Sequence, residues 1–277
     1  MTFTAPLGEL VALTVALVIS GALSGLIAGL FGVGGGTILV TVLYQALVVL
    51  GFGGEVATHV AVATSVGIIV PTSIRSYLGH HARGADDTKL LRQWIVAVPL
   101  GALAGTFVAR WLPGAALRGI FAGMCVVLAA NLLIGTRGLR LGDDIPGEPI
   151  RGLVGGFNGF LSTLLGIGGG LVNNTFMTLY GRPMHQAVAT SAGVGALVAF
   201  PGLIGHILNG LGTEGLPPFS AGYVNLLGVL VVMPTSWLLA PVGVRLAHAL
   251  TRRQLEVGFG IFVLLIAIRF VASVVWG

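Results

Sequence analysis

The chain has 277 residues, of which 55% are hydrophobic and only 8% are charged, with a formal net charge of +5. Soluble domains carry about 25% charged residues, so this composition excludes an ordinary soluble protein and predicts an integral membrane protein. The basic residues lie between apolar segments, so they indicate orientation in a bilayer rather than nucleic-acid binding. The single cysteine, Cys125, excludes an intrachain disulfide and a cysteine-based metal site.

The first apolar segment, Glu9 to Phe31, is long enough as a helix to cross a hydrocarbon core about 30 Å thick. No basic residue precedes Arg75, so we expect the segment to be a membrane helix rather than a cleaved signal peptide. A glycine cluster, Gly32 to Gly36, separates it from a shorter apolar segment at 37–52. Each glycine costs about 1 kcal/mol in a helix interior, so the cluster predicts a break between two helices.

The glycine cluster recurs in the second half of the chain. Gly166 to Gly170 repeats the spacing of Gly32 to Gly36 after 134 residues, between apolar segments at 150–165 and 171–180. The segment at 171–180 would extend only about 15 Å as a helix and cannot span. We therefore predict that each cluster is the tip of a re-entrant helical hairpin. Broken backbone at membrane depth is typical of transporters built from repeats, where it lines the binding site.

Three spanning helices are expected after each hairpin. Their approximate ranges are 57–79, 93–111 and 117–135 in the first half, and 184–208, 221–247 and 255–275 in the second. An odd number of crossings per repeat predicts inverted repeats. The expected fold is an all-α integral membrane protein of two inverted repeats, each a glycine-tipped re-entrant hairpin plus three transmembrane helices. The first repeat takes residues 1–136, a cytoplasmic linker takes 137–150 and the second repeat takes 151–277.

Loop charges favour the inverted arrangement. The loop at 80–92 carries three Lys or Arg residues, whereas its equivalent at 209–220 carries none and contains Glu214. The positive-inside rule then places the first loop and the linker in the cytoplasm, and the second loop outside. Arg110 and Arg118 fall on the outer side and are exceptions to the rule.

The hairpin tips and several nearby polar residues are candidate substrate-binding groups. Backbone N–H groups at a helix N-terminus favour an anion. Hydroxyls and amides deep in a membrane must face protein, water or substrate, because an unpaired polar group there costs several kcal/mol. The candidates are Gly34, Gly35, Gly36, Thr64, Ser65, Gly168, Gly169, Gly170, Asn173, Asn174, Thr190 and Ser191. The structural alternatives are close helix packing by glycine and hydroxyls that bond back to their own helix.

Three further residues form a candidate anion or proton pathway. His59 and His185 are repeat-equivalent and could carry a proton or simply lie near a helix end. Arg75 could point inward and attract an anion, or snorkel to the cytoplasmic surface. The expected spans contain no Asp or Glu, which favours an anionic or neutral substrate. We expect no metal site and no cofactor, because His80 and His81 lack clustered partner ligands.

Two motifs, each present once per half, resemble those of a known family. They are the glycine motifs GLIAGLFGVGGGTILV and GFNGFLSTLLGIGGGLV and the two AVATS segments. The chain resembles the TauE/SafE family of sulfite exporters. The resemblance implies a multi-pass transporter that exports sulfite, sulfoacetate or a related organosulfonate across the cytoplasmic (inner) membrane of a bacterium. Asn173 and Asn174 stand where the family usually has apolar residues, so the exact substrate stays open.

The expected mechanism is alternating access around a midplane site formed by the two hairpin tips. The expected partners are a small sulfur-containing anion and the lipid bilayer, without nucleic acid, and a homodimer is one option for assembly. An anion channel of the same architecture and a permease for another small anionic solute are the alternatives. An enzyme is disfavoured, because His59 lies six residues before Ser65, about 120° away around one helix.

Overall fold

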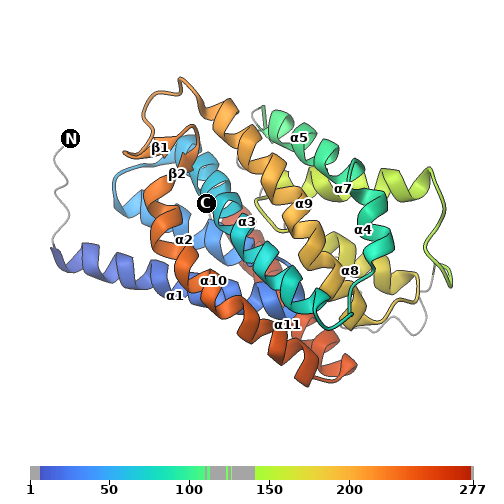
Figure 1. Cartoon of the computed structure of the whole chain (residues 1–277). Helices are drawn as coiled ribbons and strands as arrows, with labels where there is room; N and C mark the ends of the chain where they lie inside the picture. The colour runs from blue at the N-terminus through green and yellow to red at the C-terminus, as the bar shows by residue number, and fades with distance from the viewer. Residues whose placement is uncertain (1–6, 110, 113–122, 124–125, 127–140, 276–277) are drawn as a thin grey trace.

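Helices make up most of the computed structural model, which describes residues 7–109, 111–112, 123, 126 and 141–275 (Figure 1). The helices are α1 (Leu7–Phe31), α2 (Gly36–Val49), α3 (Gly54–His81), α4 (Thr88–Trp94), α5 (Ala97–Ala109), α7 (Ile150–Leu164), α8 (Gly170–Leu179), α9 (Met184–Gly210), α10 (Leu226–Ala249) and α11 (Arg252–Val275). Two short strands, β1 (Ser220–Ala221) and β2 (Val224–Asn225), form an antiparallel ribbon before α10.

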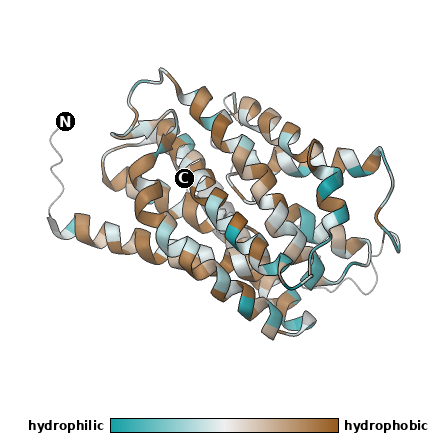
Figure 2. Ribbon diagram, viewed as in Figure 1, coloured by the Kyte–Doolittle hydropathy of each residue, from teal (hydrophilic) through white to brown (hydrophobic). Residues whose placement is uncertain are grey.

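Four of the described helices are long and apolar enough to cross a membrane: α1, α3, α9 and α10. The bent pair α4 and α5 makes a fifth crossing if it is counted as one span. Hydrophobic residues predominate along most of the helices, and hydrophilic ones gather toward α4 and the C-terminal ends of α3 and α10 (Figure 2). The predicted all-helical membrane protein is therefore confirmed at this level, apart from the small ribbon.

Two expected spans differ in detail from the structure. The span at 93–111 is broken, because α4 and α5 meet at 50°. Pro99 lies in the first turn of α5, where it has no N–H to bond the carbonyl four residues earlier, and this favours a break at that point. The span at 221–247 begins later, at Leu226, because the ribbon occupies the preceding residues. Apart from residues 123 and 126, the expected span at 117–135 lies outside the described residues, as do Arg110, Arg118 and Cys125.

The long helices α3 and α9 lie side by side at the centre and run antiparallel (Figure 1). His80 in the last turn of α3 lies 3.1 Å from His248, and the ring of His185 in the first turn of α9 lies 6.3 Å from the same residue. The C-terminal end of α3 and the N-terminal end of α9 therefore share one end of the molecule. The most apolar windows of these two helices are 72% and 67% buried, against 28% in α1 and in α10.

Helix α1 packs along α10 through glycines spaced four residues apart. Gly21, Gly25 and Gly29 face α10 so closely that a Cβ at Gly25 would overlap the Ser236 carbonyl, and one at Gly29 would overlap that of Ala240. Small residues at this spacing let two helix backbones approach in a membrane.

Helix α5 packs on α7 in the same manner. A Cβ at Gly101 would overlap the Gly156 carbonyl, and a Cβ at Gly159 would overlap that of Val98. Close backbone contact thus fixes one helix pair on each side of the central pair α3 and α9.

We expect Gly25→Ala to lower the unfolding temperature in detergent, because its methyl group meets the backbone of α10 rather than a movable side chain. Overpacking of this kind typically costs about 1–3 kcal/mol. Gly8→Ala is the matched control on the same helix, since a Cβ there meets nothing within 4 Å. Equal unfolding temperatures for the two variants would contradict the proposed role of Gly25.

Candidate functional site

At each glycine cluster, here called a tip, the backbone turns between two helices through glycines in the left-handed region. Gly34 and Gly35 have φ values of 76° and 66°, and Gly169 has 74°. Gly35 and Gly169 are the N-caps of α2 and α8, and neither helix has a side-chain cap. The first N–H groups of a helix have no partner within the helix, so both tips present backbone donors.

The two tips touch each other backbone to backbone. A Cβ at Gly36 would overlap the Gly166 carbonyl, and a Cβ at Gly170 would overlap the Gly32 carbonyl. Gly170 and Gly166 are the repeat equivalents of Gly36 and Gly32, each 134 residues later. Each tip therefore contacts the other through the same pair of equivalent positions. All of these glycines are buried. The repetition of the glycine cluster is therefore explained by a mutual contact that only glycine permits.

One serine from each central helix lies against the opposite tip. The Ser65 hydroxyl of α3 lies 3.2 Å from the Gly166 carbonyl, and a Cβ on Gly32 would lie 2.9 Å from the Cβ of Ser191 in α9. Both serines are fully buried. The central helices thus bring one serine against each tip, and the Ser65 hydroxyl itself faces the second tip.

Three buried side chains form a hydrogen-bonded network beside the second tip. The Asn173 amide nitrogen lies 2.6 Å from the Ser191 hydroxyl, which in turn donates to the Asn174 amide oxygen over 2.7 Å. Asn174 donates to the backbone carbonyl of Phe31, the last residue of α1, over 2.9 Å. The network therefore connects α8 with α9 and with the end of the first hairpin arm.

Several buried polar atoms near the tips have no hydrogen-bond partner in the described part of the chain. They are the hydroxyls of Ser24, Thr37 and Thr163, the amide nitrogen of Asn158 and the amide oxygen of Asn173. Leaving such an atom unpaired costs about 1–3 kcal/mol, so these atoms are available to water or a ligand. Ser24, Thr37, Asn158 and Thr163 were missed as sequence candidates. For Ser24 and Asn158, the separation of 134 residues, equal to that of the glycine clusters, is a signal that could have found them.

Thr64 and Thr190 use their hydroxyls elsewhere. Thr190 accepts a hydrogen bond from the Asp87 N–H over 2.8 Å, and Thr64 accepts one from the Asn225 N–H over 3.0 Å. Asp87 and Asn225 are the N-caps of α4 and α10. These threonines therefore hold the starts of two helices, whereas the neighbouring serines face the tips.

The three pathway candidates lie apart from the tips. The Nε2 atoms of His59 and His185 lie 3.3 and 3.1 Å from the backbone carbonyls of Ala109 and Leu250, at the ends of α5 and α10. Arg75 is exposed, and its guanidinium lies 4.6 Å from the centre of the Trp237 ring. Within the described ranges, no group of three or more His, Cys, Asp or Glu residues is arranged to hold a metal ion.

Sequence comparisons identify relatives of the whole chain. A probable membrane transporter protein of Haemophilus influenzae is 31% identical and covers 86% of this chain and 90% of the relative. Probable membrane transporter proteins of Methanocaldococcus jannaschii and Bacillus subtilis are 27% and 26% identical, covering 82% and 81% of this chain and 84% of each relative. No solved structure matches the chain. The model of the sulfite exporter TauE/SafE family matches residues 17–270, so this multi-pass membrane protein belongs to that family of transporters.

Proposed function

We propose that this protein is a secondary transporter that exports a small sulfur-containing anion, such as sulfite, sulfoacetate or a related organosulfonate, across the bacterial cytoplasmic membrane. The observation that carries the proposal is the meeting of two uncapped helix N-termini, those of α2 and α8, at one buried point. A helix N-terminus carries partial positive charge and backbone N–H groups aimed at an anion.

The chemistry around the tips suits an oxyanion. The polar side chains there are hydroxyls and amides, which can donate hydrogen bonds to sulfite or sulfonate oxygens. If only neutral dipoles bind the substrate, the charge that moves across the membrane is the charge of the anion itself. Its export from a cell that is negative inside is then driven by about 2.3 kcal/mol per charge per 100 mV.

Alternating access around the tips is the proposed mechanism. The tips are buried, so a solute reaches them only when packed helices move apart. The antiparallel course of α3 and α9 and the reciprocal contact of the tips support two inverted repeats that rock against each other. An anion channel of the same architecture would differ by a flux that does not saturate with substrate.

The substrate class can be tested by thermal stabilisation of the purified protein with sulfite, sulfoacetate, taurine, sulfate, thiosulfate and chloride. A ligand that binds only the folded state raises stability by about RT ln(1 + [L]/Kd). We expect sulfite or one of the organosulfonates to raise the unfolding temperature most. No shift with any sulfur-containing anion would contradict the proposed substrate class and leave a different small solute as the cargo.

Adjacent residues in α9 provide a matched test of the binding site. We expect Ser191→Ala to weaken the apparent affinity for the transported anion in proteoliposomes about 10-fold or more. The Ser191 hydroxyl holds the amides of Asn173 and Asn174 in place beside the second tip, and a hydrogen bond from such a group to a charged ligand contributes about 1.5–3 kcal/mol. Thr190→Val removes the neighbouring hydroxyl, which binds the Asp87 N–H. That variant should lose stability without losing affinity per folded protein. Equal losses of affinity in both variants would refute a binding role specific to Ser191.

The inverted repeats predict that equivalent loops lie on opposite sides of the membrane. In a Cys125→Ser background, Lys89→Cys should be labelled by an impermeant thiol reagent only from the cytoplasmic side, and Glu214→Cys only from the opposite side. Both residues are exposed, so each introduced thiol is accessible. Labelling of both from one side would exclude the inverted arrangement.

A further inference from the structure

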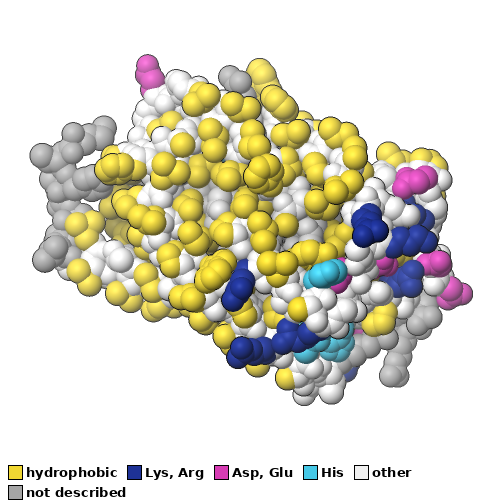
Figure 3. Space-filling model, viewed as in Figure 1, with side chains coloured by type: hydrophobic (Ala, Val, Ile, Leu, Met, Phe, Trp, Pro, Cys, Tyr) yellow, Lys and Arg dark blue, Asp and Glu magenta, His cyan; other side chains and the backbone are white. Residues whose placement is uncertain are grey.

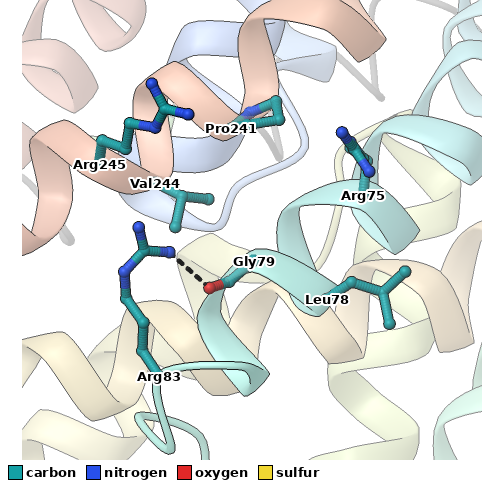
Figure 4. Close-up of a pocket in the computed structure, with 7 residues that line it drawn as sticks. All are labelled: Arg75, Leu78, Gly79, Arg83, Pro241, Val244 and Arg245. Atoms are coloured by element: carbon teal, nitrogen blue, oxygen red, sulfur yellow. Dashed lines mark hydrogen bonds between the residues drawn. The ribbon is translucent and has the colours of Figure 1, made fainter.

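A pocket between α3 and α10 gathers three arginines at one end of the molecule (Figure 4). Arg75 and Arg83 come from α3 and the loop after it, and Arg245 comes from the last turns of α10. The pocket encloses about 260 Å³, and none of the described residues that line it is acidic. It is therefore a concave site with three positive charges.

Among the described residues, no ion pair neutralises these three guanidinium groups. Arg83 donates to the Gly79 carbonyl over 2.7 Å, and Arg75 lies over the face of Trp237. Within the described chain, the carboxylates that form ion pairs are bound to other residues, such as Asp86 to His81 and Asp144 to Arg182. Uncompensated arginines in a pocket attract an anion, and the planar guanidinium binds phosphate oxygens bidentately.

The pocket opens beside a surface that faces lipid in a membrane. On α3, Ile74 and Leu78 are 45% and 54% exposed, and on α10, Leu238 and Val242 are 59% and 39% exposed. Figure 3 shows basic and histidine side chains gathered at this end of the molecule, next to a broad apolar surface. Trp237 is itself partly exposed, and tryptophan is enriched at membrane–water interfaces. The arginines thus lie where acyl chains give way to headgroups.

We propose that this pocket binds the phosphate headgroup of an anionic phospholipid, with the acyl chains along the exposed apolar faces of α3 and α10. Basic pockets between transmembrane helices are suited to such headgroups. A free anion would use the same charges but would gain nothing from the apolar walls beside them. Because α3 and α10 lie in opposite halves of the chain, the bound lipid bridges the two halves. This site is independent of the tips and of the transported substrate.

The test compares lipid retention in nanodiscs of phosphatidylcholine mixed with phosphatidylglycerol. After extraction into detergent, native mass spectrometry counts the phosphatidylglycerol that stays bound to each protein. The triple variant Arg75→Gln, Arg83→Gln, Arg245→Gln should lose binding by about fivefold per removed charge, roughly a hundredfold in total. The variant Lys89→Gln, Arg253→Gln is the control, because both residues are exposed, basic and outside the pocket.

A second triple variant, Arg75→Lys, Arg83→Lys, Arg245→Lys, keeps the charges and separates lost binding from lost folding. It should retain most of the phosphatidylglycerol, with an elution profile in size-exclusion chromatography like that of the wild type. Retention by the Gln variant equal to that of the wild type would overturn the proposal. So would equal binding of inorganic phosphate or sulfite at the pocket without any preference for the lipid, which would make it a site for a soluble anion.

Discussion

The constraint on which the structure depends is that backbone polar groups inside a membrane must find partners within the protein. Two helices are interrupted, at Gly32 to Gly36 and at Gly166 to Gly170. The hydrocarbon core of a bilayer supplies no water to bond the backbone N–H and C=O groups that each break frees. The interruptions are brought together instead. The Gly168 N–H donates to the Val33 carbonyl over 2.9 Å, so a donor freed at the second break bonds an acceptor freed at the first. The central helices α3 and α9 then enclose both.

Close approach of two helix backbones requires glycine, which lowers the stability of each helix, and this occurs at several helix contacts in the fold. Glycine destabilises a helix interior by about 1 kcal/mol relative to alanine. Gly25 against α10 and Gly159 against α5 nevertheless place glycine where any Cβ would overlap a backbone carbonyl. In a bilayer the hydrophobic effect does not drive helices together, so dispersion contacts between close backbones replace it. Glycine at these positions lowers the helix propensity, and the closer packing between helices offsets this loss.

The sequence was sufficient to predict an all-helical protein, the interruption of helices at both glycine clusters and the approximate range of most described spans, because apolar length and repeated glycine clusters are local signals. It could not separate Ser191 from Thr190. Adjacent residues in a helix point about 100° apart, and which one faces a tip depends on how α9 is rotated against its neighbours. Ser24 and Asn158 were recoverable from the repeat offset. The bend between α4 and α5 was not predicted from the sequence, because the span at 93–111 was placed by apolar composition. Pro99 was the local signal that favoured a break there.

The positions of the arginines bear on how the proposed anionic substrate would be handled. The three pocket arginines are at the surface at one end of α3 and α10, whereas the tips present only helix ends, hydroxyls and amides. A formal positive charge at a buried point would hold an anion by a strong Coulomb interaction that water does not screen. A transported ion must also leave, so moderate binding by dipoles suits turnover better than tight binding by a buried cation. Full charges are then best placed at the lipid headgroups, where they orient and anchor the protein without trapping its cargo.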